Sequence, residues 1–367
     1  MRLREIALYV MFFSYSFYTV GLFLSPVYLL SLFAFILSLP LLNGYDPRSV
    51  LLIFVMLLFA IFSIYRIEFE NINFAYSANL IASLLLIASY LGIYKKVDTN
   101  ALVGIFTKSI AFFGVLFISD TFARVAYPPP VDSAVMAAWQ KQGVVFYQFK
   151  SSWLFSDSNT VAISSLCILS VLFYFKKLGI FKQRVINTYV PLYVFLICAS
   201  LSRAAIIGLT VLLFLSIRSS IVKISILVLG TMVASYVLSM LVIDDPSLNT
   251  KLDIYRIFYE YLIIDMEVDS LFFGLGVDQA RHLFDRVPHS LFITVFVELG
   301  FVGLGLLLLL LFLSCPRRHP EILILPLLVS SLSYFPYYGM PFFYFLLVYA
   351  KSISDRVLLN TVVHKVR

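Results

Sequence analysis

His289 and Arg203 are the two residues whose type and position most directly suggest chemistry. His289 stands just before an apolar run that begins at Leu291, and an imidazole can transfer a proton near neutral pH. Arg203 follows Ser202 between two apolar runs, and its planar guanidinium matches phosphate oxygens. Each residue has a structural alternative. A histidine at a helix start often caps the helix, and an interfacial arginine can extend toward lipid head groups.

Other charged residues could support these two. The segment 244–290 is rich in cations that would attract an anionic substrate or simply form a solvated surface. These cations are Lys251, Arg256, Arg281 and Arg286, and His282 lies one heptad before His289. Glu298 lies inside the apolar run after His289, where a carboxylate must face protein or a water-filled cavity. It could relay a proton, pair with an arginine or bind another buried polar group.

The composition indicates a membrane protein. Of 367 residues, 61% are hydrophobic and 13% charged, whereas soluble domains are about 25% charged. The net charge of +7 is explained by cationic inner loops, so no nucleic-acid partner is expected. The three cysteines have no CxxC spacing and predict no disulfide framework or zinc site. No acidic pair has metal-ligand spacing, so no metal or other cofactor is expected.

The apolar runs predict an all-α polytopic protein with about twelve spanning helices, each of roughly 20 residues. The chain reads as one integral membrane domain over residues 1–367. The predicted spans are Ala7–Leu24, Pro26–Leu42, Ser49–Tyr65, Ala75–Tyr94, Ala101–Ser119, Asn159–Phe175, Ile186–Leu201, Ala204–Ile217, Ile224–Ile243, Leu291–Ser314, Ile322–Tyr334 and Pro341–Ala350. Placing both termini in the cytoplasm puts most Lys and Arg residues on the inner side. Lys108 is the other charge within a span, and its partner cannot be predicted.

Two long outer segments interrupt this pattern, over residues 120–158 and 244–290. Segments longer than about 12–15 residues are usually functional or disordered. Pro128-Pro129-Pro130 cannot be helical. Apolar residues of the second segment recur at helical spacing and predict short amphipathic helices that lie on the membrane surface or cap a cavity. These residues are Leu252, Tyr255, Tyr259 and Leu262, followed by Val277, Ala280 and Phe284.

Taken in order, these landmarks resemble the bacterial O-antigen polymerase and O-antigen ligase superfamily. His289-Ser290 precedes a span containing Gly300 and Gly303, as in that family. The Ser202-Arg203-Ala204 turn resembles a second family landmark, and Phe273-Gly274-Leu275-Gly276 resembles its apolar-G-x-G segment. The resemblance covers roughly Leu201 to Leu310. The family often has an arginine about four residues before an aromatic early in the long loop.

This chain departs from that last pattern. Lys251 stands four residues before Tyr255, and Arg256 follows directly, so the sequence leaves open which cation contacts phosphate. The resemblance implies an inverting, metal-independent glycosyltransferase at the periplasmic face of a bacterial inner membrane. The donor would be a glycan on undecaprenyl diphosphate. Arg203 with Lys251 or Arg256 would bind the diphosphate, and His289 would orient or deprotonate the acceptor hydroxyl.

The remaining candidates would bind or support the substrate: Arg281, His282, Arg286 and Glu298. Polymerase is the favoured activity, because the compact chain has an idiosyncratic first half. An O-antigen ligase acting on lipid A–core is the alternative, and a lipid-linked oligosaccharide flippase or other transporter is the rival from another class. Expected partners are the lipid-linked oligosaccharide, membrane lipids and a chain-length regulator protein.

Overall fold

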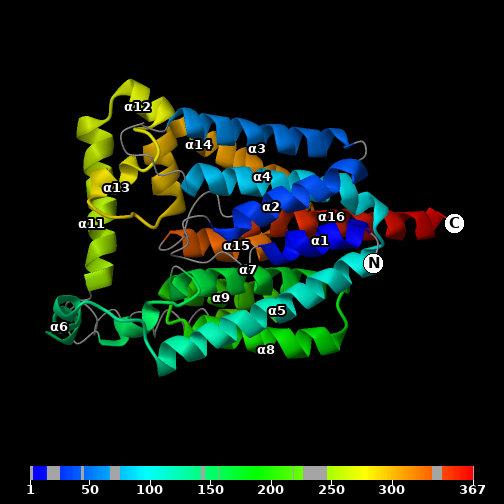
Figure 1. The fold of residues 1–367 in the computed structure, drawn as a ribbon, viewed down its shortest axis with the longest axis horizontal. Helices are drawn as coiled ribbons and strands as arrows, with labels where there is room; N and C mark the ends of the chain where they lie inside the picture. The colour runs from blue at the N-terminus through cyan, green and yellow to red at the C-terminus, as the bar shows by residue number, and fades with distance from the viewer. Residues whose placement is uncertain are drawn as a thin grey trace.

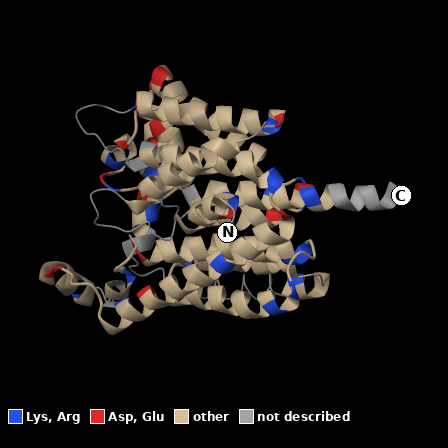
Figure 2. Ribbon diagram, turned by 45° about the vertical axis from the view of Figure 1, so that its right-hand side comes forward, with Lys and Arg blue, Asp and Glu red and all other residues tan. Residues whose placement is uncertain are grey.

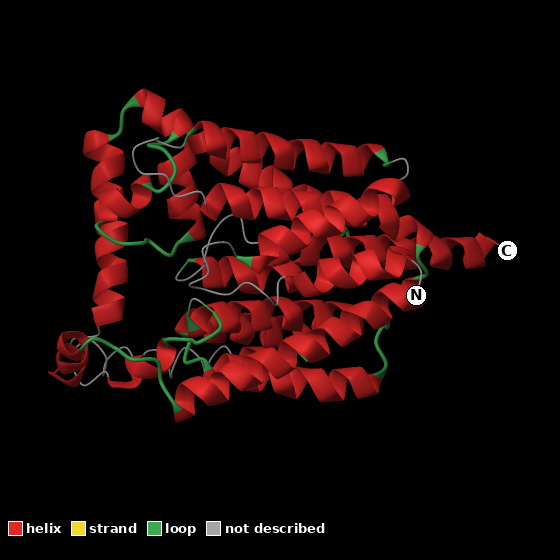
Figure 3. Ribbon diagram, in the orientation of Figure 1, coloured by secondary structure: helices red, strands yellow, loops and turns green. Residues whose placement is uncertain are grey.

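The protein forms a bundle of helices with shorter helices across one end (Figure 1). The computed structural model describes residues 3–14, 25–42, 45–66, 75–141, 145–155, 157–217, 219–225, 246–332 and 341–366. Within these ranges the regular secondary structure is helical and contains no strand (Figure 3). The predicted all-α class is therefore confirmed.

The bundle helices follow the apolar runs of the sequence. They are α1 (Leu3–Ser14), α2 (Pro26–Ser38), α3 (Pro47–Tyr65), α4 (Ala75–Ile93), α5 (Thr99–Ala126), α7 (Ser158–Lys177), α8 (Gln183–Ala199), α9 (Arg203–Ser216), α14 (Leu291–Ser314), α15 (Pro320–Ser331) and α16 (Pro341–Val366). Single short turns η2 (Leu39–Leu41) and η3 (Tyr94–Lys96) extend α2 and α4.

Shorter helices gather at one end of the bundle, which we call the loop end (Figure 1). They are α6 (Ser133–Lys141), η4 (Val145–Lys150), α11 (Pro246–Glu260), η5 (Tyr261–Asp265), α12 (Val268–Phe273) and α13 (Gln279–Phe284). Figure 1 shows α11 standing across the loop end, nearly perpendicular to the bundle axis. Both long segments singled out in the sequence thus contain short helices, and both lie at the same end.

Five of the described helices are long and apolar enough to cross a membrane. They are Pro47–Tyr65, Ala78–Lys96, Thr99–Ala126, Ser158–Lys177 and Leu291–Ser314. Three shorter apolar helices, Pro26–Leu41, Arg203–Ser216 and Pro320–Ser331, lie beside them. Residues 15–24 of the predicted first span and 226–243 of the ninth fall outside the described ranges. The full number of spans and the cytoplasmic placement of the termini stay predictions.

Aspartates start three of the long helices. Asp46, Asp98 and Asp157 each accept a backbone N–H in the first turn of α3, α5 and α7, at 2.8, 2.9 and 2.9 Å. Such caps satisfy N–H groups that have no partner inside the helix.

Charged residues gather mainly at the two ends of the bundle, and its middle is largely uncharged (Figure 2). This distribution suits a protein whose middle lies in hydrocarbon.

The centre of the bundle is α7, which is buried along nearly its whole length. It packs against α8, α9, α15 and α16.

Lys108, on the exposed side of α5, donates to the Tyr9 hydroxyl at 2.9 Å and lies over its ring. Its partner in the structure is therefore a phenol, which shields the ammonium without a buried carboxylate.

The first long segment begins later than the sequence predicts. The predicted start was Asp120, but α5 continues to Ala126. Asp120 and Arg124 are both fully buried on this last part of the helix. The helix can continue because both charges find partners in the segment that follows, as described below. Residues 128–130 are non-helical, as the three prolines predict.

Cysteine labelling tests the predicted orientation. In a background with Cys198 and Cys315 replaced, Ala134→Cys at the loop end should react with an impermeant maleimide on intact spheroplasts. Lys182→Cys, at the opposite end between α7 and α8, should react only after permeabilisation. Both positions are exposed, so access to the reagent is set by the membrane. Labelling of Lys182→Cys in intact spheroplasts would reverse the orientation.

Candidate functional site

Three helix boundaries lie at the loop end of the bundle. There α7 begins at Ser158, α8 passes to α9 through residues 200–202, and α14 begins at Leu291. The Ser158 hydroxyl donates to the Ser200 carbonyl at 2.9 Å, which fixes the α8–α9 turn beside the start of α7. Ser158, Ser200 and Ser202 are all fully buried. The candidate site includes this turn and His289, which precedes α14 and interacts electrostatically with Asp157 at the start of α7.

His289 occupies the last position but one before α14. Its backbone is left-handed, with φ 53°, a conformation that costs a non-glycine residue about 1–3 kcal/mol and often marks functional segments. The residue is exposed, although protein surrounds the ring. Desolvation of the imidazolium by this surrounding protein lowers the pKa of His289 below its usual value. Nearby Lys251 lowers this pKa further, and Asp157 opposes the shift.

Asp157 links His289 to the start of α7. Its Oδ1 accepts from the Thr160 backbone N–H at 2.9 Å and from the Thr160 hydroxyl at 3.1 Å. Asn159 Nδ2 donates to Oδ2 at 3.0 Å. These bonds hold the carboxylate at the mouth of the site, where it interacts electrostatically with His289 and also with Arg124. Asp157 was not among the predicted site residues.

Arg203 is the first residue of α9 and is exposed. The preceding turn is sharp, because Leu201 has a left-handed φ of 56°. Ser202 is the N-cap position of α9, and the Ala204 carbonyl accepts from Ser330 of α15 at 2.9 Å. Buried neighbours therefore fix the backbone of this turn, while the guanidinium remains accessible. This is the arrangement expected for an arginine that receives a ligand from outside.

The structure separates the two cations that the sequence could not. Lys251 lies close enough to His289 to act on its charge. Arg256 is exposed and donates to Glu260 of the same helix at 2.9 Å. Of these two cations, Lys251 is the one that lowers the pKa of His289, and Arg256 is paired with Glu260.

The apolar residues that the sequence singled out in α11 lie on its exposed side. Leu252, Tyr255 and Tyr259 are 58%, 42% and 65% exposed, and Leu262 is exposed as well. The buried side instead carries Ile254 and is continued by Tyr261. Because α11 is apolar on two sides, helical spacing alone does not show which side is buried. In contrast, Val277, Ala280 and Phe284 are buried.

Arg281, His282 and Arg286 are exposed around α13. The helix is held from below by Ala280 and Phe284, which belong to a small apolar cluster with Ile293 and Val297 of α14. The three charged side chains thus lie on the outer surface of the loop end. No bond joins them to His289 in the described residues, so their predicted role in substrate binding depends on what approaches that surface.

The glycines of both sequence landmarks meet in one backbone contact. Gly274 and Gly300 have φ of 73° and 61°, and Gly300 interrupts the helical geometry of α14. A Cβ on Gly274 would lie 2.3 Å from the Glu298 carbonyl carbon, and one on Gly300 would lie 2.4 Å from that of Phe272. Only glycine permits this approach of two backbones.

Hydrogen bonds close the same contact. The Leu275 and Gly276 N–H groups donate to the Val297 and Glu298 carbonyls at 2.7 and 3.0 Å, where the break at Gly300 frees these acceptors. Arg66, at the end of α3, donates to the Gly274 carbonyl at 2.6 Å. Its own carbonyl accepts from Val277 at 3.0 Å. Arg66 was not among the predicted site residues.

Glu298 lies at this contact and is almost completely buried. It faces protein, as predicted for a carboxylate within an apolar run. Its main-chain carbonyl belongs to the contact with Gly276, which indicates support of the loop. Among the described residues, no group of three or more His, Cys, Asp and Glu side chains gathers as a metal site.

Asp120 and Arg124 anchor the first long segment and were missed by sequence reasoning. Asp120 Oδ1 accepts from Ser152 Oγ at 2.7 Å and from two backbone N–H groups of the same segment. Arg124 donates to the carbonyls of Phe149 and Ala199 at 2.8 and 2.9 Å. The available signal was two opposite charges four residues apart in an apolar run, which face the same side of a helix.

The site therefore combines a desolvated, accessible imidazole, an aspartate and a lysine beside it, and an accessible arginine at a neighbouring helix start. An imidazole with a lowered pKa is neutral at pH 7 and can accept a proton, and the cations can stabilise negative charge. Two cavities lined by described residues lie at the opposite end of the bundle. Comparison with protein-family models, curated proteins and solved structures finds no match to this chain.

Proposed function

We propose that the chain is an O-antigen polymerase of a bacterial inner membrane, with its active site facing the periplasm. It would join undecaprenyl-diphosphate-linked repeat units without a metal or nucleotide. The observation that carries the proposal is the position of His289, beside Asp157 and Lys251 at the end of the bundle where Arg203 begins α9. The meeting of Gly274 and Gly300 supports it, because these glycines belong to the landmarks on which the family resemblance depends.

The proposed reaction is a single displacement at the anomeric carbon. The acceptor hydroxyl attacks this carbon and gives its proton to the His289 ring. The bond from the anomeric carbon to the diphosphate oxygen breaks, and its electron pair leaves with the diphosphate. Arg203 and Lys251 would stabilise this developing charge. Asp157 would stabilise the imidazolium that forms, as an adjacent carboxylate does in other sites.

The glycan profile of a strain lacking the gene separates this function from its rivals. A polymerase predicts core bearing single repeat units. Complete absence of O-antigen on the cell surface, with polymerised lipid-linked glycan in the periplasmic leaflet, would mean the ligase. Accumulation of lipid-linked units on the cytoplasmic side would mean a flippase. Either of the last two results would contradict the polymerase.

Arg203 gives a graded prediction. Arg203→Ala should lower polymerisation at least about tenfold, since a charge-assisted bond to a charged group is worth about 1.5–3 kcal/mol. Arg203→Lys should be impaired as well, because an ammonium cannot make the two parallel bonds of a guanidinium. Repeat-number distributions on core, normalised to protein in the membrane, measure the effect. Full activity of Arg203→Ala would leave the arginine a role at the lipid interface only.

The pH dependence follows from the direction of the His289 shift. A base acts in its neutral form, and the surrounding protein lowers the pKa of His289 below 6.5. Polymerisation by the purified enzyme should therefore lose half of its rate at a pH below 6.5, the usual pKa of histidine. Lys251→Ala removes a cation that lowers the pKa of His289. The pH at which the polymerisation rate falls on acidification should therefore be higher in this variant. Movement to lower pH would contradict the assignment.

A further inference from the structure

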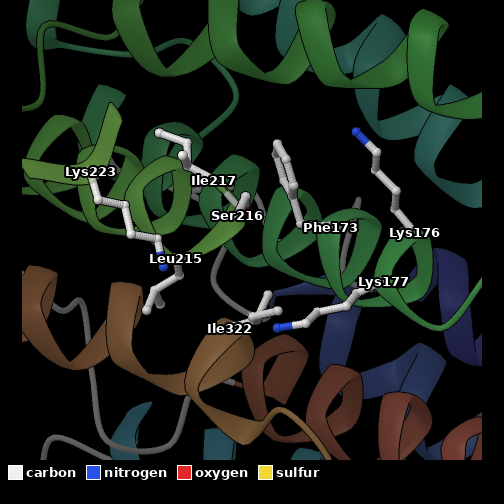
Figure 4. Close-up of a pocket in the computed structure, with 8 residues that line it drawn as sticks. All are labelled: Phe173, Lys176, Lys177, Leu215, Ser216, Ile217, Lys223 and Ile322. Carbon is white, nitrogen blue, oxygen red and sulfur yellow. The ribbon is translucent and has the colours of Figure 1, made fainter. Parts of the chain in front are cut away.

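A cavity with a strongly basic lining lies at the end of the bundle opposite to His289. Its volume is about 370 Å³, and it lies between α7, α9, α15 and the segment 219–225. Three of the eight lining residues are lysines and none is acidic (Figure 4). The lining residues are Phe173, Lys176, Lys177, Leu215, Ser216, Ile217, Lys223 and Ile322.

The three lysines do not point in one direction. Figure 4 shows the Lys177 ammonium beside Ile322 and the Lys223 ammonium beside Leu215, on the same side of the cavity and from opposite directions. Lys176 extends to the other side. Two elements far apart in sequence, the end of α7 and the segment 219–225, thus supply a pair of cations to one space.

Little negative charge offsets this pair. Glu321 Oε1 is 3.8 Å from Lys177 Nζ, and both side chains are about 40% exposed, a geometry that gives at most a weak ion pair. A second cavity at the same end, of about 510 Å³, is different in charge. There Asp46 and Asp355 accompany the cations, and Lys95 pairs with Asp46 at 3.1 Å. Charge imbalance is therefore a property of the first cavity and not of this whole end.

The apolar residues indicate the form of the ligand. Phe173, Leu215, Ile217 and Ile322 line the same cavity as the lysines. A small inorganic anion would gain nothing from these side chains, whereas an amphiphile would place its polar group on the ammoniums and its carbon chain along them. Basic pockets between helices at a membrane surface bind acidic lipid head groups by this combination.

We propose that this cavity binds a phosphate group, held between Lys177 and Lys223. Its chemistry is that of an anionic phospholipid head group or of a free phosphate, and the apolar lining favours the phospholipid. The site is independent of the proposed glycosyl transfer, because it lies at the other end of the bundle and shares no residue with the candidate active site. A phosphate group bound by Lys177 and Lys223 would link the end of α7, the central helix, to the segment 219–225.

The test uses the full chain in nanodiscs of phosphatidylcholine, titrated with dihexanoyl phosphatidylglycerol and followed by native mass spectrometry. Lys177→Ala and Lys223→Ala should each weaken binding about fivefold. Glu321→Gln should strengthen it, because it removes the carboxylate nearest Lys177. Lys176→Ala is the matched control. It removes the same charge from the same helix turn, but its ammonium lies on the other side of the cavity, over the Phe173 ring, so binding should change less than about twofold.

Lys223→Arg keeps the charge and should retain binding, which separates a lost contact from a disturbed fold. Inorganic phosphate supplies the second arm. If it displaces the lipid at similar concentration, the ligand is a free phosphate, and if it does not, the ligand is the phospholipid; either result supports the site. If Lys176→Ala and Lys177→Ala weaken lipid binding equally, the lipid is attracted by the surface charge in general, and the proposal is wrong. Unchanged lipid binding in the double variant Lys177→Ala/Lys223→Ala would also overturn it.

Discussion

His289→Ala should lower the rate of repeat-unit transfer about 10²–10⁴-fold, the usual contribution of a positioned acid or base. The reason is local: the neutral imidazole is accessible at the mouth of the site, with Asp157 placed to stabilise it once it is protonated. Cells should carry core with single or very short repeats. The rate is measured with purified protein and lipid-linked repeat units, and the distribution of repeats on core provides the cellular measurement.

The chain offers a close control in His319. Both histidines have a left-handed backbone, with φ of 53° and 54°, and both stand just before a helix. His319→Ala therefore imposes the same change of residue and the same backbone conformation at the opposite end of the bundle. It should leave transfer unchanged. If His289→Ala extends repeats at the wild-type rate, the histidine is structural and the catalytic assignment is wrong.

A second substitution separates two roles of the histidine. Asparagine tolerates the left-handed conformation well, and its amide can orient a hydroxyl without accepting its proton. His289→Asn should therefore fold normally and be as slow as His289→Ala if His289 is the base. Activity in His289→Asn but not in His289→Ala would mean that the residue positions the acceptor and another group takes the proton.

The all-α class could be predicted because a membrane helix must be apolar over its whole length, and five of the described helices are long and apolar enough to cross a membrane. The starts of α3, α5 and α7 could be read from Asp46, Asp98 and Asp157, which precede apolar runs. The late end of α5 could not, because Asp120 and Arg124 resemble the first charges of a loop. They continue the helix only because partners at Phe149, Ser152 and Ala199 fold back onto them.

Individual residues of the candidate site could be predicted from the sequence, but their arrangement in space could not. His289 and Arg203 attract attention by residue type and position. Asp157 lies far from both in sequence, and no local period indicates that it approaches His289. The choice between Lys251 and Arg256 has the same cause. Five helical positions separate them, so their side chains lie about 140° apart around α11, and only the packing of this helix decides which one faces the site. Arg66 joins Gly274 across an even longer separation.

Gly274→Ala should strongly destabilise the protein. A Cβ there would lie 2.3 Å from both the carbonyl carbon and oxygen of Glu298. Neither atom belongs to a flexible side chain, so the backbones must separate. The conformation itself, φ 73° and ψ −179°, is nearly restricted to glycine. Overpacking costs about 1–3 kcal/mol and the backbone strain about 1–3 kcal/mol, so we expect a loss of about 2–6 kcal/mol.

Separating these backbones would break the bonds from Leu275 and Gly276 to α14 and release Arg66 from the Gly274 carbonyl. The loop that leads to His289 would then lose its support, and activity should fall with stability. Unfolding temperature in detergent at a fixed heating rate measures the first effect. Gly305→Ala is the matched control, because it lies in α14 with no neighbouring atom within 4 Å of its added Cβ, and alanine favours a helix over glycine. Gly305→Ala should keep or raise the unfolding temperature. Equal unfolding temperatures for Gly274→Ala and Gly305→Ala would mean that the contact of Gly274 with α14 does not hold the loop.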